Sequence, residues 1–126
     1  MNKYSLLLAI CFVLLLSSCG QQHKAKNLVN DFMEANVKDF SVINEKNFGK
    51  IDSSSFISDS MVMDMRKKAN DLKLYKNGIK YTAGKLPDVY YFIRVTYNTQ
   101  SGKGKTHKNL QTFYFDKEIT RIIAFK

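Results

Sequence analysis

The chain has 126 residues and carries 20 basic against 11 acidic side chains, which gives a formal net charge of +9. This length is normal for one domain and too short for two. Hydrophobic residues make up 44% and aromatic residues 13% of the chain, so a core that needs no disulfides is feasible.

The N-terminal segment has the pattern of a processing signal. Lys3 supplies positive charge, and residues 6–16 form an apolar run interrupted only by Cys11. That run is shorter than the roughly 20 apolar residues that a transmembrane helix needs. Residues 16–20 read Leu-Ser-Ser-Cys-Gly, with small residues directly before the cysteine. The sequence therefore predicts a cleaved signal peptide at residues 1–18.

This pattern resembles the lipobox of bacterial lipoprotein signals. The resemblance implies that Cys19 carries a diacylglycerol and an N-acyl chain and becomes the mature N-terminus. Removal of 18 of the 126 residues would leave 108, and the formal charge would fall from +9 to +8 because Lys3 is the only charge lost. No thiol would remain for a disulfide, a metal site or a nucleophile. The alternative is an ordinary cleaved signal followed by a chance cysteine.

The residues after the cysteine predict where the domain lies. Residues 19–26 are expected to form a short tether, which would hold the domain at 27–126 close to its membrane. Surface lipoproteins of Bacteroidetes tend to carry acidic residues after the lipidated cysteine, whereas residues 20–24 here read Gly-Gln-Gln-His-Lys. The chain therefore resembles a cell-envelope lipoprotein anchored in the outer membrane and facing the periplasm.

The net positive charge has a different implication in a secreted domain than in a cytosolic one. In a cytosolic protein it would favour nucleic acid as a partner, but a secreted domain meets little nucleic acid, so we expect no such binding. The lysines and arginines are scattered along the chain. They predict a solvated surface that is attracted to anionic lipid headgroups or glycans.

Two helices are predicted in the first half of the domain. An amphipathic helix spans about residues 24–38, and the mixed segment 39–55 predicts a short helix or turns. A second helix starts near Ser58, where Ser suits the N-cap and Asp59 suits the helix dipole. The apolar faces of the two helices are formed by Leu28, Val29, Phe32, Met33 and Ala35, and by Met61, Val62, Met65, Ala69 and Leu72.

The sequence of the second half of the domain predicts antiparallel strands. Asn77 and Gly78 predict the turn of a short hairpin between residues 72–75 and 79–82. Alternating apolar residues then predict strands on either side of a mobile loop rich in glycine and lysine at 100–105. These strands are residues 89–99, 106–116 and 119–125.

Helices followed by a β-meander predict the α+β class, with N-terminal helices packed on a C-terminal antiparallel sheet. The lipobox and residues 28–33, 56–58 and 112–118 are together similar to small Bacteroidetes lipoproteins with NTF2-like or cystatin-like folds. That resemblance implies a sheet curled around the helices and a cone-shaped cavity. In relatives the cavity either binds small molecules or is filled by side chains, and the fold alone does not decide between the two.

The sequence offers little for catalysis. His23 lies beside the expected anchor and His107 follows the loop, with no second histidine at metal-binding spacing. Asp31, Glu34 and Asp64 fall on the polar faces of the predicted helices. We therefore expect no enzymatic activity, no catalytic residue, no metal and no cofactor.

Two non-catalytic functions remain. The first is a protein-interaction module that uses the loop and the sheet edge, with an unknown protein or a second copy of the chain as partner. The alternative is a module that binds a small apolar or amphipathic ligand. Both depend on a sheet with aromatic residues on its two faces, of which one face would stay exposed. The candidate ligand or partner face is Tyr91, Tyr97, Phe113, Phe115, Tyr90 and Phe92. The candidate anion contacts are Lys103, Lys105 and Lys108.

Overall fold

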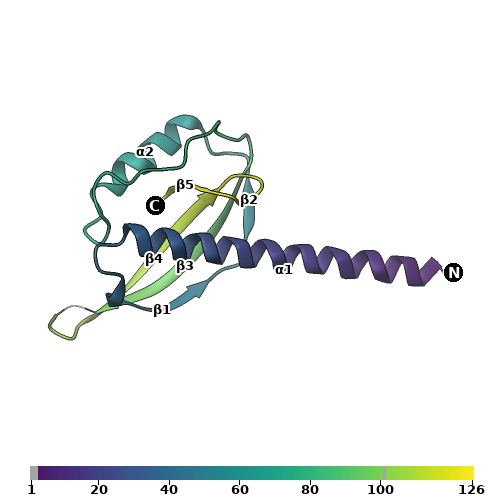
Figure 1. Cartoon of the computed structure of the whole chain (residues 1–126), viewed down its shortest axis with the longest axis horizontal. Helices are drawn as coiled ribbons and strands as arrows, with labels where there is room; N and C mark the ends of the chain where they lie inside the picture. The colour runs from purple at the N-terminus through teal and green to yellow at the C-terminus, as the bar shows by residue number, and fades with distance from the viewer. Residues whose placement is uncertain (1–2, 101) are drawn as a thin grey trace.

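The computed structural model describes residues 3–100 and 102–126, and the side chains of residues 6–19 lie outside this description. Helices and a five-stranded antiparallel sheet confirm the predicted α+β class (Figure 1). No helix in the described part of the chain has the length and apolar character needed to span a bilayer. In chain order the elements are α1 (Lys3–Asn36), the short 3-10 helix η1 (Phe40–Val42), β1 (Ile43–Phe48), β2 (Asp52–Ser54), α2 (Asp59–Ala69), β3 (Tyr90–Gln100), β4 (Thr106–Phe115) and β5 (Ile122–Phe125).

The sheet is built around β3 and β4, the two longest strands. Its order is β1-β3-β4-β5, and β2 continues the β1 side by pairing with the start of β3. Ile93 lies opposite Phe113 and Tyr97 lies opposite Asn109, so odd-numbered residues of both strands share one face. We call this odd-numbered face the α1 face and the even-numbered face the outer face.

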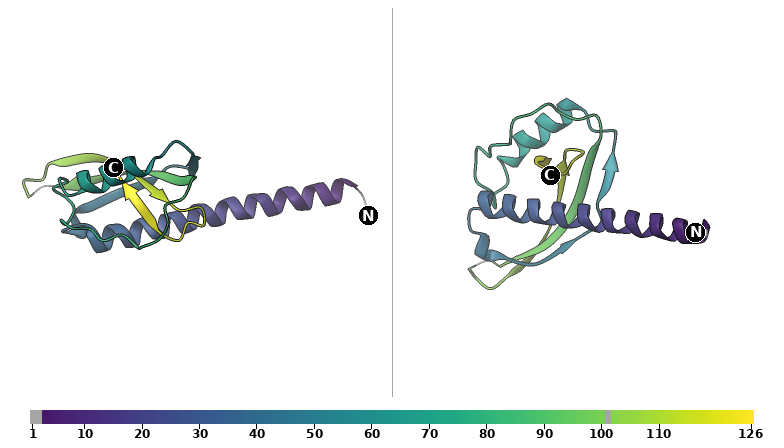
Figure 2. Two further views of the ribbon diagram at one scale, coloured as in Figure 1. Left: turned by 90° about the horizontal axis from the view of Figure 1, so that it is seen from above. Right: turned by 45° about the vertical axis from the view of Figure 1, so that its right-hand side comes forward.

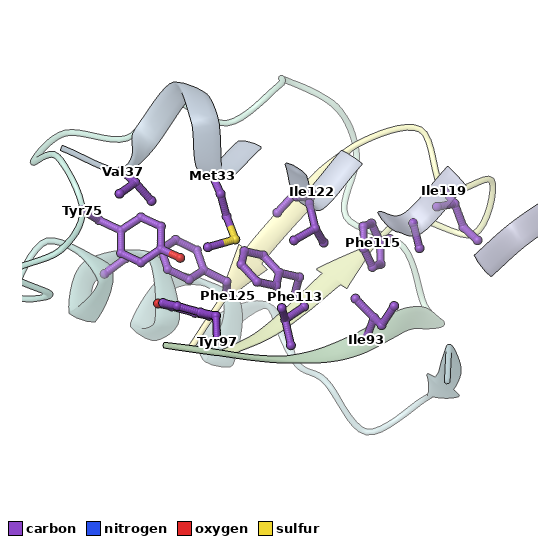
Figure 3. Close-up of a cluster of buried hydrophobic side chains, with 14 residues drawn as sticks. Met33, Val37, Tyr75, Ile93, Tyr97, Phe113, Phe115, Ile119, Ile122 and Phe125 are labelled. Carbon is purple, nitrogen blue, oxygen red and sulfur yellow. The ribbon is translucent and has the colours of Figure 1, made fainter. Parts of the chain in front are cut away.

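The C-terminal half of α1 packs across the α1 face, and the N-terminal half projects beyond the sheet (Figure 1). Side chains from this part of the helix and from the sheet form the core between them (Figure 3). The helical repeat brings Ala25, Val29, Met33 and Val37 onto one side, and all four are buried. Phe113 lies beneath them and stacks on Phe125, with ring centroids 5.4 Å apart. The other buried residues of this cluster are Ala69, Tyr75, Ile93, Val95, Tyr97, Phe115, Ile119 and Ile122.

Helix α2 begins as predicted and covers a smaller area. Ser58 caps it by accepting a hydrogen bond from the Met61 N–H at 3.2 Å. The helix lies beside β5, and its Val62 and Met65 pack against Tyr90 and Tyr114 of the outer face. The outer face is therefore covered over β5 and over the adjoining ends of β3 and β4, whereas Arg94 and Leu110 further along these strands are exposed.

The expected tether is helical and belongs to the folded unit. The side-chain amide of Gln22 donates to the Gly49 carbonyl at 2.8 Å and accepts from the Ile51 N–H at 2.9 Å. The Lys24 ammonium donates to the Glu118 carbonyl at 3.0 Å, and Ala25 is fully buried. The packed domain thus starts several residues before 27, because α1 continues without a break from the core towards Cys19.

The predicted hairpin at residues 72–82 is wrong. Residues 70–89 contain no helix or paired strand apart from one isolated bridge between Val37 and Tyr75. Tyr75 forms this bridge because its ring is buried in the core beside Phe125. The chain bends at Asn77 and Gly78, where Gly78 has a φ of +71°, but the two flanking segments do not pair with each other.

The mixed segment 39–55 holds two strands that the prediction missed. β1 and β2 both pair with β3, and Glu45 has a φ of +52° where the register between β1 and β3 shifts. The last strand is also shorter than predicted. Residues 116–121 form a turn that includes Ile119 at φ +54°, a conformation that β-branched residues rarely adopt.

We predict that Phe113→Ala lowers the free energy of unfolding by about 3–5 kcal/mol, because the fully buried ring would leave a cavity between α1 and the sheet. Chemical denaturation of the two proteins measures this difference. Leu110→Ala is the matched control on the same strand, since Leu110 is 57% exposed, and it should change stability by less than about 0.5 kcal/mol. Equal losses in the two variants would contradict the assignment of Phe113 to the core.

Candidate functional site

The six aromatic residues of the candidate face do not form an exposed surface. Tyr90, Tyr97, Phe113 and Phe115 are buried, and Tyr91 is half-buried against the α1 core. Phe92 is half-buried beside Tyr114, with ring centroids 5.9 Å apart. These aromatic rings therefore stabilise the domain, and a binding surface has to be sought elsewhere.

A small polar cluster lies within the α1 core, in the place where a cone-shaped cavity was expected. The Tyr75 hydroxyl donates to Gln111 Oε1 at 3.5 Å, and the Tyr97 hydroxyl donates to the same oxygen. Burial raises the pKa of both tyrosines, so both phenols stay neutral at physiological pH. The cluster provides two donors to the side-chain oxygen of the buried Gln111, and the polar character of this residue gave no indication in the sequence that it would be buried.

The outer edge of β4 is paired over only half of its length. Thr112 exchanges two backbone hydrogen bonds with Lys126, of 2.8 and 3.1 Å, directly after β5. Backbone groups alternate along a strand, so the N–H and C=O of Leu110 and Lys108 point the same way as those of Thr112. In the described chain no strand covers β4 beyond this point. The result is an open strand edge that leads into the β3–β4 hairpin.

The candidate anion contacts lie along this edge. Lys103 and Lys105 lie in the hairpin loop and Lys108 on β4, and all three are exposed. No acidic residue occurs in the sequence from residue 98 to 111. The structure thus brings the three lysines together at one end of the sheet, as part of a basic strand edge.

An apolar groove of about 360 Å³ separates α2 from the end of β5. Its wall includes Met61, which is 43% exposed, and its floor includes Tyr114. The Asp64–Lys68 ion pair, 2.8 Å long, lies at its rim. The methionine stripe of the predicted helix was the only sequence signal for this groove, and that stripe also contributes to the core.

The candidate acid–base residues do not meet. The ring nitrogen Nε2 of His23 lies 3.2 Å from the Asn27 amide, near the start of the packed part of α1. His107 is exposed on β4 beside the hairpin, at the other end of the domain. Asp31 and Glu34 are exposed, and the described residues contain no group of three or more His, Cys, Asp and Glu side chains that could hold a metal.

No protein-family model, curated protein or solved structure matches this chain. The NTF2-like or cystatin-like fold name therefore stays a prediction. Lipidation also stays a prediction, because the side chain of Cys19 lies outside the described residues. Function has to be argued from the geometry of this chain alone.

Asp116 is a carboxylate whose surroundings give a measurable pH dependence. Its Oδ1 accepts from the N–H groups of Thr120 at 2.7 Å and Arg121 at 3.1 Å, and its Oδ2 accepts from the Thr120 hydroxyl. Burial alone would raise the pKa of Asp116, but these hydrogen bonds outweigh it and hold the pKa below its usual value. The charged form therefore stabilises the β4–β5 turn.

We predict that Asp116→Asn lowers the free energy of unfolding by about 1–3 kcal/mol at pH 7. A folded-state pKa below the unfolded value gives stability that is complete above about pH 4 and is lost as the pH falls through the folded pKa. The difference between wild type and variant should therefore shrink in acid. Denaturation curves from pH 7 to pH 2 measure it, with the exposed Asp71→Asn as control. A pH-independent difference would contradict the role of the carboxylate.

Proposed function

We propose that the chain is a non-enzymatic lipoprotein of the bacterial cell envelope that acts as a protein-interaction module. It would be anchored by Cys19, with the domain on the periplasmic side of the outer membrane, in line with the lipobox and with the lack of acidic residues directly after it. The observation that carries the proposal is the open edge of β4. An unpaired strand edge is a template for an extended segment of another protein.

The position of the edge relative to the anchor supports this function. α1 rises by about 1.5 Å per residue, so Cys19 and the helix end at Asn36 are about 25 Å apart. The chain then passes through η1 to Ile43, which pairs with Thr99 at the base of the hairpin. The hairpin therefore lies at the far end of the domain from the anchor (Figures 1 and 2). An anchored domain would present its open edge away from its own membrane.

The charge of the edge supports a choice of partner. Lys103, Lys105 and Lys108 would repel the same lysines of a second copy, and lysines on strand edges oppose self-association. They would attract an acidic segment instead. Beside them Leu110, exposed on the outer face, offers an apolar contact to alternate side chains of an added strand. The partner we propose is a protein with an extended acidic segment.

A photo-crosslinking residue at Leu110 tests this function in the native host. We expect a discrete adduct that is lost in Lys108→Pro, because proline removes the outward N–H that a partner strand needs. Lys108→Ala is the matched control, since it removes the same charge and keeps the N–H, and it should retain most of the adduct. Lys103→Glu with Lys105→Glu should weaken the adduct if the partner segment is acidic. Melting temperatures check that each variant is folded.

The outcomes separate the candidate partners. An adduct of twice the chain mass would mean that a second copy binds the edge. Equal adducts in Lys108→Pro and Lys108→Ala would refute strand addition. Retention of the adduct after charge reversal at Lys103 and Lys105 would refute an acidic partner.

The second candidate function is binding of a small apolar or amphipathic ligand. Side chains fill the α1 face, where the cone-shaped cavity was expected, so the apolar groove beside α2 is the place that favours this alternative. Native mass spectrometry of the processed protein tests it. A mass beyond the acylated chain that disappears on denaturation would support a bound ligand, and its absence after purification from the native host would count against one.

A further inference from the structure

A second surface lies at the opposite end of the domain from the open edge. We infer that the cleft between the first packed turns of α1 and the β1–β2 connection binds the phosphate headgroup of an anionic phospholipid in the membrane that holds the anchor. This inference rests on the proposed lipidation of Cys19. It is independent of the proposed partner at β4.

The cleft has a fixed shape. It has a volume of about 560 Å³ and lies between Gln22, His23 and Lys26 of α1 and residues 48–51 of the connection. The two hydrogen bonds from the Gln22 side chain to Gly49 and Ile51 hold the two walls together. On the other side, the Gly49 N–H donates to the Arg94 carbonyl of β3 at 2.8 Å. The connection is therefore fixed to the helix and to the sheet at once.

The charged residues that line the cleft are all basic. Lys26 and Lys50 line it together with His23, and none of its lining residues is acidic. Among the described residues no carboxylate pairs with either lysine. The Lys26 ammonium lies 5.8 Å from the centre of the Phe48 ring, which leaves its hydrogen-bond donors free to reach an anion. A phosphate diester offers the matching charge and acceptor oxygens.

The distance from the anchor points to a lipid as the source of that phosphate. His23 and Lys26 follow Cys19 by four and seven residues in α1, which is about 6 and 10 Å along the axis. An acylated cysteine places its glyceryl group at the surface of the hydrocarbon core. The cleft would then lie at the depth of the headgroups, where lysines are attracted to anionic lipid. Phe48 and Ile51, the apolar residues that line the cleft, would contact the glycerol backbone of the lipid.

The lysines of the β3–β4 hairpin lie too far from Cys19 to contact the membrane that would hold the anchor. Lys103 and Lys105 lie beyond the end of α1, about 25 Å or more from the anchor and well outside a Debye length of about 8–10 Å. They have the same side-chain chemistry and the same exposure as Lys50. They therefore provide a control in which charge is changed equally at the wrong end of the molecule.

The test uses the processed, acylated protein in dodecyl maltoside micelles, which contain no phosphate. Phosphatidylglycerol or zwitterionic phosphatidylcholine is added in steps, and amide NMR signals of His23, Gly49 and Lys50 are followed. We expect saturable shifts with phosphatidylglycerol only. Lys26→Glu with Lys50→Glu should weaken the apparent affinity at least about tenfold, because each lysine at an anionic surface contributes about one factor of five. Lys103→Glu with Lys105→Glu should leave it within about twofold, because those lysines lie beyond the Debye length.

Three results would overturn the inference. Equal shifts with phosphatidylcholine would remove the requirement for anionic lipid. An equal loss of affinity in the two charge-reversal variants would mean diffuse attraction without a site. Saturation by inorganic phosphate at the same concentration would identify a free-phosphate site. If the double variant does not fold, Lys50→Gln at an exposed position replaces it.

The failure of the inference and the failure of the anchor are separable. The intact mass of the purified protein shows directly whether Cys19 carries acyl chains. An unmodified cysteine would refute both the anchor and the membrane placement of the cleft. An acylated protein without a phosphatidylglycerol response would refute the headgroup site alone.

Discussion

The packing of α1 on the sheet is the constraint on which the rest of the molecule depends. Val29 and Met33 are buried in one cluster with Phe113 and Phe125, so the helix cannot shift without opening the core. Because the same helix continues unbroken towards Cys19, the core also fixes the direction in which the chain leaves the domain. The hydrogen bonds of Gln22 to the β1–β2 connection extend this rigidity towards Cys19. An interior packing arrangement thereby determines which surfaces are near the N-terminus and which are far from it.

The direction of α1 separates two basic surfaces of the domain and suggests a different partner for each. The cleft beside Gln22 and the hairpin beyond Thr99 are both basic, yet they lie at opposite ends of α1. A domain on a loose tether would turn freely, and either end could meet the membrane. With the proposed lipidation of Cys19, a domain whose helix is part of the core would present one end to the bilayer and the other to the space beyond it. The proposed division between lipid contact and protein contact therefore follows from the rigidity of α1.

The sequence predicted the elements whose stability is local or strongly periodic. The Ser58 cap, the alternation of Ile93, Val95 and Tyr97, and the returning strand with Phe113 were all found. The failures have physical causes. Strand β1 reads Ile-Asn-Glu-Lys-Asn-Phe, and only its partner β3 makes it a strand, because its own residues show no alternation. The chain bends at Asn77 and Gly78, but Tyr75 gains more from burial beside Phe125 than from pairing with residues 79–82.

The candidate binding surfaces could be predicted even less well than the fold, because the sequence does not show which sheet face is covered or which strand edge stays unpaired. A period of two shows which side chains share a face, but it does not show which face a helix will cover. Tyr90 and Phe113 looked alike as candidates for an exposed aromatic surface, and each is buried by a different helix. The open edge depends on which residues of β4 pair with β5: that strand lies against residues 113–115, and no strand in the described part of the chain lies beside residues 106–111 on that edge.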